Sequence, residues 1–252
     1  MKRMWIAALC GLVCTSGTMA ADWGGISGQI VVTGEIPDRV LLHAKGAVIK
    51  DAEVCAAADT YSDELIIDKE SKGLANAFIY LAKAPKSIHP DLKEPAAKKV
   101  IFDQKGCAFL PHAMIVRAGQ TVEVISSDSI AHNTHTYPVK NNAVNVLIAP
   151  KTPAGKGVDV ACKLAERIPA QVKCDYHPWM IAYWMILDHP YAAITDKDGK
   201  FTIENLPDGD HEFVVWHEKM GYIDRKYKAK VTKGKVSDLK PIEVPVAKLT
   251  AK

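Results

Sequence analysis

The sequence lacks the short motifs of several common enzyme classes. It contains no Gly-x-Ser-x-Gly, no P-loop and no His-Glu-x-x-His, so nucleophilic hydrolysis, phosphoryl transfer and zinc-protease chemistry have no motif to carry them. Helical periodicity is scarce, and we find neither an internal repeat nor a low-complexity tract. We therefore expect a protein that is not an enzyme.

Long apolar runs and concentrated charge are also missing. Beyond the N-terminal region, no stretch approaches the roughly 18–20 uncharged residues that a membrane-spanning helix needs, so we expect no transmembrane segment. The formal net charge is only +3, and neither sign gathers along the chain. Because nucleic-acid binding needs a basic stripe or face, we expect no nucleic-acid partner.

The N-terminus predicts a secretory signal peptide over residues 1–20. Met1–Arg3 is basic, Trp5–Val13 is apolar, and a region of small residues ends at Ala20, which is the layout of a cleaved signal. Loss of the two basic residues at its start lowers the formal charge from +3 to +1. We expect an exported protein, periplasmic or secreted, long enough for one large or two small domains.

Four cysteines lie beyond the signal: Cys55, Cys107, Cys162 and Cys174. If Cys174 binds a metal, three remain, and one intramolecular disulfide is the most that they can form. An oxidising compartment favours such a bridge, although sequence does not determine its pairing. Our working choice is Cys55 with Cys107, and the pairings through Cys162 stay open.

The remainder of the chain predicts an all-β fold. Turn signals recur every 8 to 12 residues between alternating, β-branched segments, a pattern typical of β-sandwiches. Ala118–Gln120 divides one such region into two strands joined by a tight turn, and the second strand ends just before His132. The polar stretch 138–157 is expected to be a surface excursion.

The segment Cys174–Met180 is the densest concentration of metal-binding side chains. It places Cys174, His177 and Met180 at Cys-x₂-His-x₂-Met spacing in one loop. Thiolate, thioether and imidazole together suit copper, and a His₂Cys set with a weak axial Met is the blue-copper arrangement. His132, at the predicted strand end, is the best second histidine. We therefore expect one copper ion held by His132, Cys174, His177 and Met180.

Two alternatives compete with copper at these residues. Cys174 could be disulfide-bonded while His177 and Met180 merely pack, and zinc also binds Cys and His in exported proteins. The Met180 thioether argues against zinc. Among the other histidines, His135 lies at odd spacing from His132 and should face the opposite side of the strand, while a second site that uses His112 or His217 stays open.

The copper loop and its surroundings resemble the cupredoxins, most closely amicyanin and plastocyanin. The resemblance spans Val100–His189 and rests on the copper loop with these further motifs: Phe109-x-Pro111, Gly119-Gln120-Thr121-Val122, Ser127-Asp128 and His132-Asn133. It implies a Greek-key sandwich in which Asn133 ties the two ligand loops together. It also implies an exposed His177 edge, beside Trp179, where redox partners dock.

Tyr176 departs from the amicyanin pattern, which tends to have proline just before the second histidine. Its backbone N–H is free to donate a hydrogen bond to the Cys174 sulfur, and such a bond favours the reduced state. We expect Tyr176→Pro to lower the reduction potential.

Both ends of the chain resemble a different sandwich. Gly25–Gly34 and Thr195–Gly209 are similar to the opening and closing strands of carboxypeptidase-regulatory or transthyretin-like modules. The resemblance implies a cupredoxin domain over 98–193, inserted in or packed against a transthyretin-like sandwich built from 22–97 plus 194–252. The whole pattern also resembles exported proteins of the methylamine-utilisation type.

Together these resemblances imply an exported mononuclear copper protein that carries single electrons between redox partners. Two other functions stay open. The same ligands could bind Cu(I) for delivery or storage, or the chain could be a non-metal scaffold.

Overall fold

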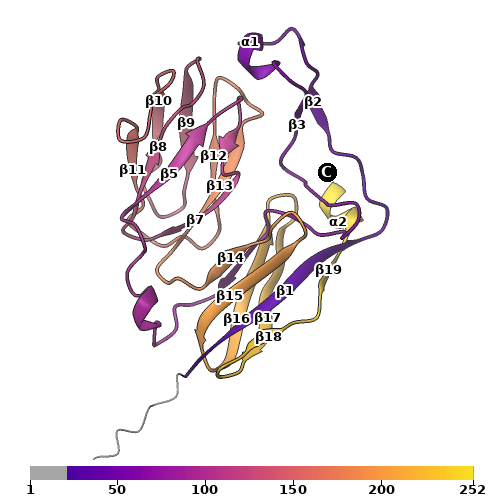
Figure 1. The fold of residues 1–252 in the computed structure, drawn as a ribbon, viewed down its shortest axis with the longest axis vertical. Coiled ribbons are helices and arrows are strands. Elements are labelled where there is room, and N and C mark those ends of the chain that lie inside the picture. Colours follow the sequence, from indigo (N-terminus) through magenta and orange to yellow (C-terminus); the bar gives the residue numbers. More distant parts are fainter. Residues whose placement is uncertain (1–21, 252) are drawn as a thin grey trace, which may run out of the picture.

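The structure is a computed structural model that describes residues 22–251. Their regular secondary structure is almost all β-strand, and most of the strands are arranged in two sandwiches (Figure 1). The predicted all-β class is therefore confirmed. The signal-peptide prediction for 1–20 lies outside the described residues. Helical structure within 22–251 is limited to three short pieces: α1 (Ala52–Cys55), α2 (Val246–Thr250) and the 3₁₀ turn η1 (Pro90–Leu92). None of the described helices is long and apolar enough to span a bilayer.

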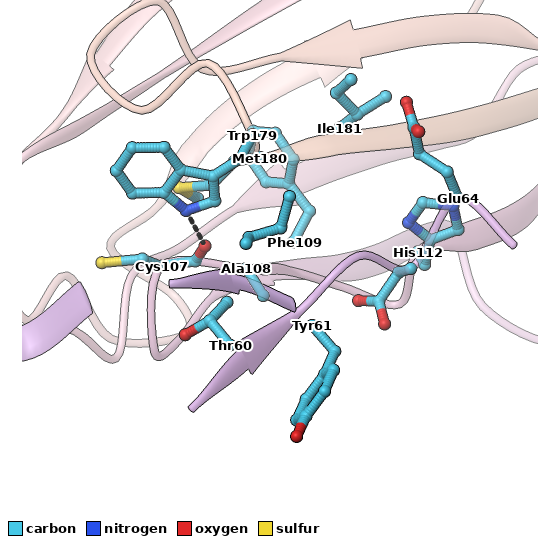
Figure 2. Close-up of a pocket in the computed structure, with 12 residues that line it drawn as sticks. Thr60, Tyr61, Glu64, Cys107, Ala108, Phe109, His112, Trp179, Met180 and Ile181 are labelled. Atoms are coloured by element: carbon cyan, nitrogen blue, oxygen red, sulfur yellow. Dashed lines mark hydrogen bonds between the residues drawn. The ribbon is translucent and has the colours of Figure 1, made fainter. Parts of the chain in front are cut away.

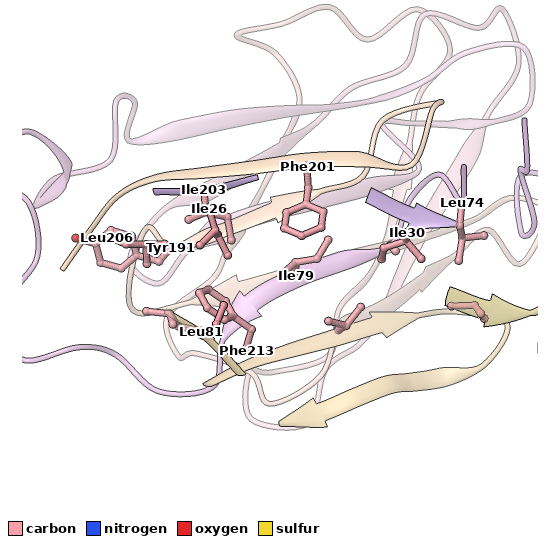
Figure 3. Packing of buried hydrophobic residues seen from close by; sticks show 14 of the residues in the cluster. Ile26, Ile30, Leu74, Ile79, Leu81, Tyr191, Phe201, Ile203, Leu206 and Phe213 are labelled. Carbon is pink, nitrogen blue, oxygen red and sulfur yellow. The ribbon is translucent and has the colours of Figure 1, made fainter. Parts of the chain in front are cut away.

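The terminal sandwich combines strands from both ends of the chain. One sheet has the order β15-β1-β18, with β19 also paired to β1: β1 (Trp23–Thr33), β15 (Lys200–Pro207), β18 (Val236–Asp238) and β19 (Ile242–Pro245). The other has the order β14-β4-β16-β17: β4 (Phe78–Leu81), β14 (Ala192–Ile194), β16 (Gly209–His217) and β17 (Gly221–Val231). Alternating apolar residues such as Ile26, Ile30, Phe201 and Phe213 fill the space between the two sheets (Figure 3).

The central sandwich contains the predicted copper loop. One sheet has the order β10-β9-β12-β13-β7: β7 (Ala113–Arg117), β9 (His132–Tyr137), β10 (Asn145–Ile148), β12 (Ala170–Lys173) and β13 (Ile181–Leu187). The other has the order β11-β8-β5-β6: β5 (Lys99–Gln104), β6 (Phe109–Leu110), β8 (Thr121–Val124) and β11 (Val158–Ala161). The stretch 138–157 is thus more than a surface excursion, because β10 within it pairs with β9.

A third apolar cluster joins the two sandwiches. Phe78, Tyr80 and Trp216 of the terminal sandwich pack against Met185 and Leu187 of the central one. The Tyr80 hydroxyl also donates a hydrogen bond of 3.0 Å to the Arg167 carbonyl. This shared core fixes the two sandwiches against each other.

Residues 40–61 form a strap that leaves the terminal sandwich and runs along the central one (Figure 1). The strap contains β2 (Leu41–His43), β3 (Thr60–Tyr61) and α1, and β2 and β3 pair with each other in a separate two-stranded sheet. Cys55 of the strap belongs to the core of the central sandwich and is disulfide-bonded to Cys107. The predicted pairing is therefore confirmed, and it attaches the strap to the central sandwich.

Candidate metal centre

The first donor residue and the donor loop meet because of strand pairing at one end of the central sandwich. β9 begins at His132, and β12 ends at Lys173, immediately before Cys174. β12 pairs with β9 on one side and with β13 on the other. The Cys174–Met180 loop joins β12 to β13 and therefore lies over the end of the sandwich to which the β9–β12 pairing brings His132.

Three soft or borderline donor atoms converge at this end. One atom from each of His132, Cys174 and His177 lies within 4.8 Å of the other two. The Nδ1 atoms of the two histidines are 3.0 Å apart, and the Cys174 sulfur is 3.7 Å from His177 Nδ1. All three side chains are buried, so their donor atoms face one another and are shielded from solvent.

Met180 closes the loop through its backbone hydrogen bonds. The Cys174 N–H donates to the Met180 carbonyl at 3.2 Å, and the Met180 N–H donates to the His177 carbonyl at 2.9 Å. The Met180 side chain is buried in the same apolar cluster as Cys174. The set of two imidazoles, one thiolate and one thioether fits copper, for which this combination is typical.

Hydrogen bonding inside the cluster favours an ionised sulfur. Burial alone would raise the pKa of the Cys174 thiol, but hydrogen bonds from His132 and His177 outweigh it and lower that pKa from 9.0 to about 6. Burial likewise opposes a charged His132, yet its bonds to Asp128 and Cys174 raise the His132 pKa from 6.5 to about 9. Thiolate is the form in which cysteine binds metals.

We expect the Cys174 thiol of the metal-free protein to ionise near pH 6. Ultraviolet thiolate absorbance, followed during a pH titration, measures this directly. Cys162 serves as an internal control, because burial raises its pKa to about 12 and keeps it protonated over the same range. An absorbance step that persists in Cys174→Ala, or that occurs only near pH 9, would contradict the expectation.

Each donor histidine is held from its far side by a carboxylate. His132 Nε2 is 2.8 Å from Asp128 Oδ2, and His177 Nε2 is 2.9 Å from Asp51 Oδ2. A carboxylate on the outer nitrogen fixes the tautomer and orients the ring, which leaves Nδ1 as the inward-facing donor atom. Sequence reasoning did not assign either carboxylate a role.

Asp51 contacts His177 and does not cap the helix that it precedes. It occupies the N-cap of α1 with φ 53°, in the left-handed region, and its side chain makes no capping hydrogen bond. Aspartate at an N-cap ordinarily bonds an amide of the first turn. Here the carboxylate points to His177 instead, and such local strain is typical of residues with a role at a site.

The strap buries His177 completely, so the expectation of an exposed His177 edge is wrong. Asp51 contacts Nε2, and Trp179 packs edge-on against His43 of the strap at 4.4 Å between ring centroids. Trp179 Nε1 also donates to the Cys107 carbonyl at 3.2 Å (Figure 2). The cause is the strap, tied down by the Cys55–Cys107 disulfide, which occupies the face where a partner was expected to dock.

Asn133 lies between the two donor segments. Its Oδ1 accepts a 2.7 Å hydrogen bond from the Asp175 N–H and lies 3.3 Å from the Cys174 sulfur. The backbone groups that lower the Cys174 pKa belong to Asn133 and His177. Tyr176 is exposed, with the Lys50 ammonium 4.4 Å above its ring, so tuning by its N–H stays a prediction.

The remaining histidines lie outside the donor cluster. His135 contacts Asp175 at 3.2 Å and the Tyr137 hydroxyl at 2.9 Å near the surface. His112 is paired with Glu218 where the sandwiches meet, and burial lowers the pKa of His217 to about 4. Among residues 22–251, no group of three metal-binding side chains includes any of these histidines.

The fold and this cluster define a two-sandwich β-protein with a buried set of imidazole and thiolate donors. No family model and no curated protein matches the chain. Solved structures that resemble it include a reduced tryptophan-to-tyrosine mutant of amicyanin, with a TM-score of 0.31 and 19% identity over 37% of this chain and 86% of that chain.

Two further solved structures are similar at the same level. A copper-containing nitrite reductase from Thermus scotoductus has a TM-score of 0.30 and 16% identity over 42% of this chain and 25% of that chain, so the match spans a quarter of the reductase. A purple cupredoxin from Nitrosopumilus maritimus has values of 0.28 and 14% over 34% of this chain and 97% of that chain. Similarity this low carries no argument about function, and none of these matches supports the transthyretin-like resemblance.

Proposed function

We propose that this chain is an exported mononuclear copper protein that carries single electrons and has no substrate of its own. The observation that carries the proposal is the convergence of His132 Nδ1, Cys174 Sγ and His177 Nδ1 in one buried cluster. Met180 is buried in the same apolar core as Cys174. When bound, copper would supply a one-electron Cu(I)/Cu(II) couple. The four side chains would hold the ion and exclude water from it.

Two features of the described residues favour electron transfer over copper delivery. The donor side chains are buried, which opposes exchange of the ion with an acceptor. Both histidines are also held by carboxylates, and a site that barely moves between oxidation states suits electron transfer. The disulfide between Cys55 and Cys107 supports the exported, oxidising location.

Redox partners would approach the site through the strap. Asp51 is the strap residue in contact with His177, and its side chain is partly exposed. A partner that docks near Asp51 and Tyr176 would be one hydrogen-bonded contact from the ring of a ligand. This replaces the direct docking on His177 that the sequence predicted.

Voltammetry and copper transfer separate the proposal from its alternatives. An electron carrier loaded with one copper ion should show a reversible one-electron wave and release little copper to a competing chelator. Rapid release of Cu(I) without a reversible wave would point to delivery instead. Failure to bind one equivalent of copper would leave only a scaffold role.

We expect Asp51→Ala to weaken copper binding by about 10-fold, at the low end of what outer-shell contacts contribute. The reason is that His177 loses the carboxylate that orients its ring. Competition with a chelator at fixed pH measures the change. Asp51→Asn is the matched control, because asparagine also tolerates the left-handed backbone and can still accept from Nε2–H. If Asp51→Ala and the native protein bind copper with equal affinity, Asp51 does not contribute to the metal site.

A further inference from the structure

The Cys55–Cys107 disulfide lies beside the donor histidines. The two sulfurs and a nitrogen of His177 all lie within 4.8 Å of one another, and all three residues are buried. Cys107 also forms a second such group with Asp128 and His132. The disulfide therefore does more than tie down the strap, since it brings two potential thiolates to the edge of the metal centre.

We propose that Cys55, Cys107 and His177 form a second site, specific for Cu(I), that becomes available when the Cys55–Cys107 disulfide is reduced. An external dithiol supplies the two electrons: its two thiols become a disulfide, the Cys55–Cys107 bond breaks, and each cysteine takes up one proton. Both protons leave when the thiolates bind the metal. The oxidised form offers no thiolate and has no second site.

The two cysteines are held in place by bonds other than the disulfide. The Cys55 N–H donates to the Asp51 carbonyl at 2.9 Å, and the Cys55 carbonyl accepts from the Thr60 hydroxyl at 3.2 Å. The Cys107 N–H donates to Asp128 Oδ2 at 2.9 Å, and its carbonyl accepts from Trp179 Nε1. Reduction consequently leaves two thiols that still face each other beside His177.

The composition of the group selects Cu(I). Two thiolates and one imidazole are soft donors, and thiolates favour Cu(I). The group has three donor residues, whereas a structural zinc site is closed by four. The surroundings are also apolar, since both cysteines belong to the core of the central sandwich, and a monovalent ion costs less to bury there than a divalent one.

The strap is the element that admits the reductant. Its strands β2 and β3 pair with each other and not with either sandwich, and a two-stranded sheet is marginally stable by itself. Local opening of such a region needs less free energy than global unfolding. Local opening of the strap on either side of Cys55 therefore exposes the disulfide, which still links Cys55 to Cys107, while the core strands stay folded.

This second site shares His177 with the proposed copper centre but uses none of its other residues, so Cys174→Ala separates the two. That variant removes the thiolate of the first site and leaves Cys55, Cys107 and His177 intact. We expect the full-length Cys174→Ala protein to bind one equivalent of Cu(I) when its disulfide is reduced, and none when it is intact. Anaerobic titration of Cu(I) against a competing chelator, with native mass spectrometry, gives the stoichiometry.

Two controls make the result decisive. Adding Cys55→Ser to Cys174→Ala should abolish Cu(I) binding under reducing conditions. In the chain with native Cys174, reduction should raise the Cu(I) stoichiometry above that of the disulfide form by up to one equivalent. Equal stoichiometry before and after reduction in Cys174→Ala, or binding that survives Cys55→Ser, would overturn the proposal. If the chain with native Cys174 binds no copper while its disulfide is intact, that result counts against the proposed function and not against this second site.

Discussion

Replacing Asp128 by alanine should weaken copper binding by about 10- to 100-fold and destabilise the fold by roughly 3 to 5 kcal/mol. The Asp128 carboxylate is buried and accepts from the Gly106 N–H at 2.6 Å and the Cys107 N–H at 2.9 Å, and it also bonds His132 Nε2. Its removal leaves two buried groups, the Cys107 N–H and His132 Nε2, and the part-buried Gly106 N–H without this partner. The His132 ring also loses its orientation. Chemical denaturation and chelator competition measure the two effects.

The stability effect of Asp128→Ala should also depend on pH in the metal-free protein. Burial opposes ionisation of Asp128, but its bonds to His132 and to the Cys107 and Gly106 amides hold its pKa below 3.8. Its contribution is therefore fully present above about pH 4 and is lost as the pH falls through the lowered value. The His132 contribution, with a pKa raised to about 9, is fully present below 6.5 and is lost as the pH rises through 9.

The difference in stability between Asp128→Ala and the native chain should consequently be largest between about pH 4 and 6.5. Asp128→Asn is the matched control, because it keeps the size of the side chain and one acceptor oxygen. It should cost less than alanine and show a weaker pH dependence. A difference that does not change from acid to alkaline pH would show that the carboxylate charge plays no part.

Removing the disulfide with Cys55→Ser and Cys107→Ser should lower the free energy of unfolding by about 4 kcal/mol. The two cysteines are 52 residues apart, and closing a loop of this length restricts the unfolded chain considerably. Because the strap also loses its covalent attachment, His177 should become more accessible. Denaturant unfolding gives the first quantity, and hydrogen exchange of the strap amides gives the second.

Cys162→Ala is the matched control for the disulfide variant. Cys162 is a buried free cysteine of the same core, so its replacement removes a thiol without releasing the strap. It should cost less than half as much stability and leave strap exchange unchanged. If the serine pair behaves like Cys162→Ala, the disulfide does not hold the strap over the site.

The candidate donor residues could be named from the sequence because short-range patterns mark their positions. Cys174, His177 and Met180 occur in one loop, and His132 follows an alternating run that predicts a strand. The structure brings His132, Cys174 and His177 together. Asn133 could be named for the same reason, since its position follows directly from that of His132.

The position of the strap over the site was not predictable, because no local sequence pattern indicates which part of the chain the strap contacts. Asp51 lies in a stretch with no alternation, and its contact with His177 spans 126 residues. That contact depends on the position of α1, which is fixed by a disulfide between residues 52 positions apart. The burial of His177 follows from the same tertiary arrangement, which is why the expected exposed edge is absent.

The positions of strands in the sequence were also easier to predict than which strands pair with each other. The turn at Ala118–Gln120 does separate two strands, β7 and β8. They lie in different sheets, β7 beside β13 and β8 between β5 and β11, so the turn carries the chain across the sandwich and does not close a hairpin. A turn signal predicts where the backbone reverses. Which sheet each strand joins depends on which of its side chains are buried in the folded protein, and a turn signal does not show this.

The most direct test of the copper centre is an absorption spectrum of the purified protein with one equivalent of Cu(II), with its disulfide intact, recorded for the native chain and for Cys174→Ala. The native chain should develop an intense visible thiolate-to-copper band that saturates at one equivalent, and Cys174→Ala should develop none. A native spectrum without that band, or the same band in Cys174→Ala, would contradict a centre in which Cys174 binds copper.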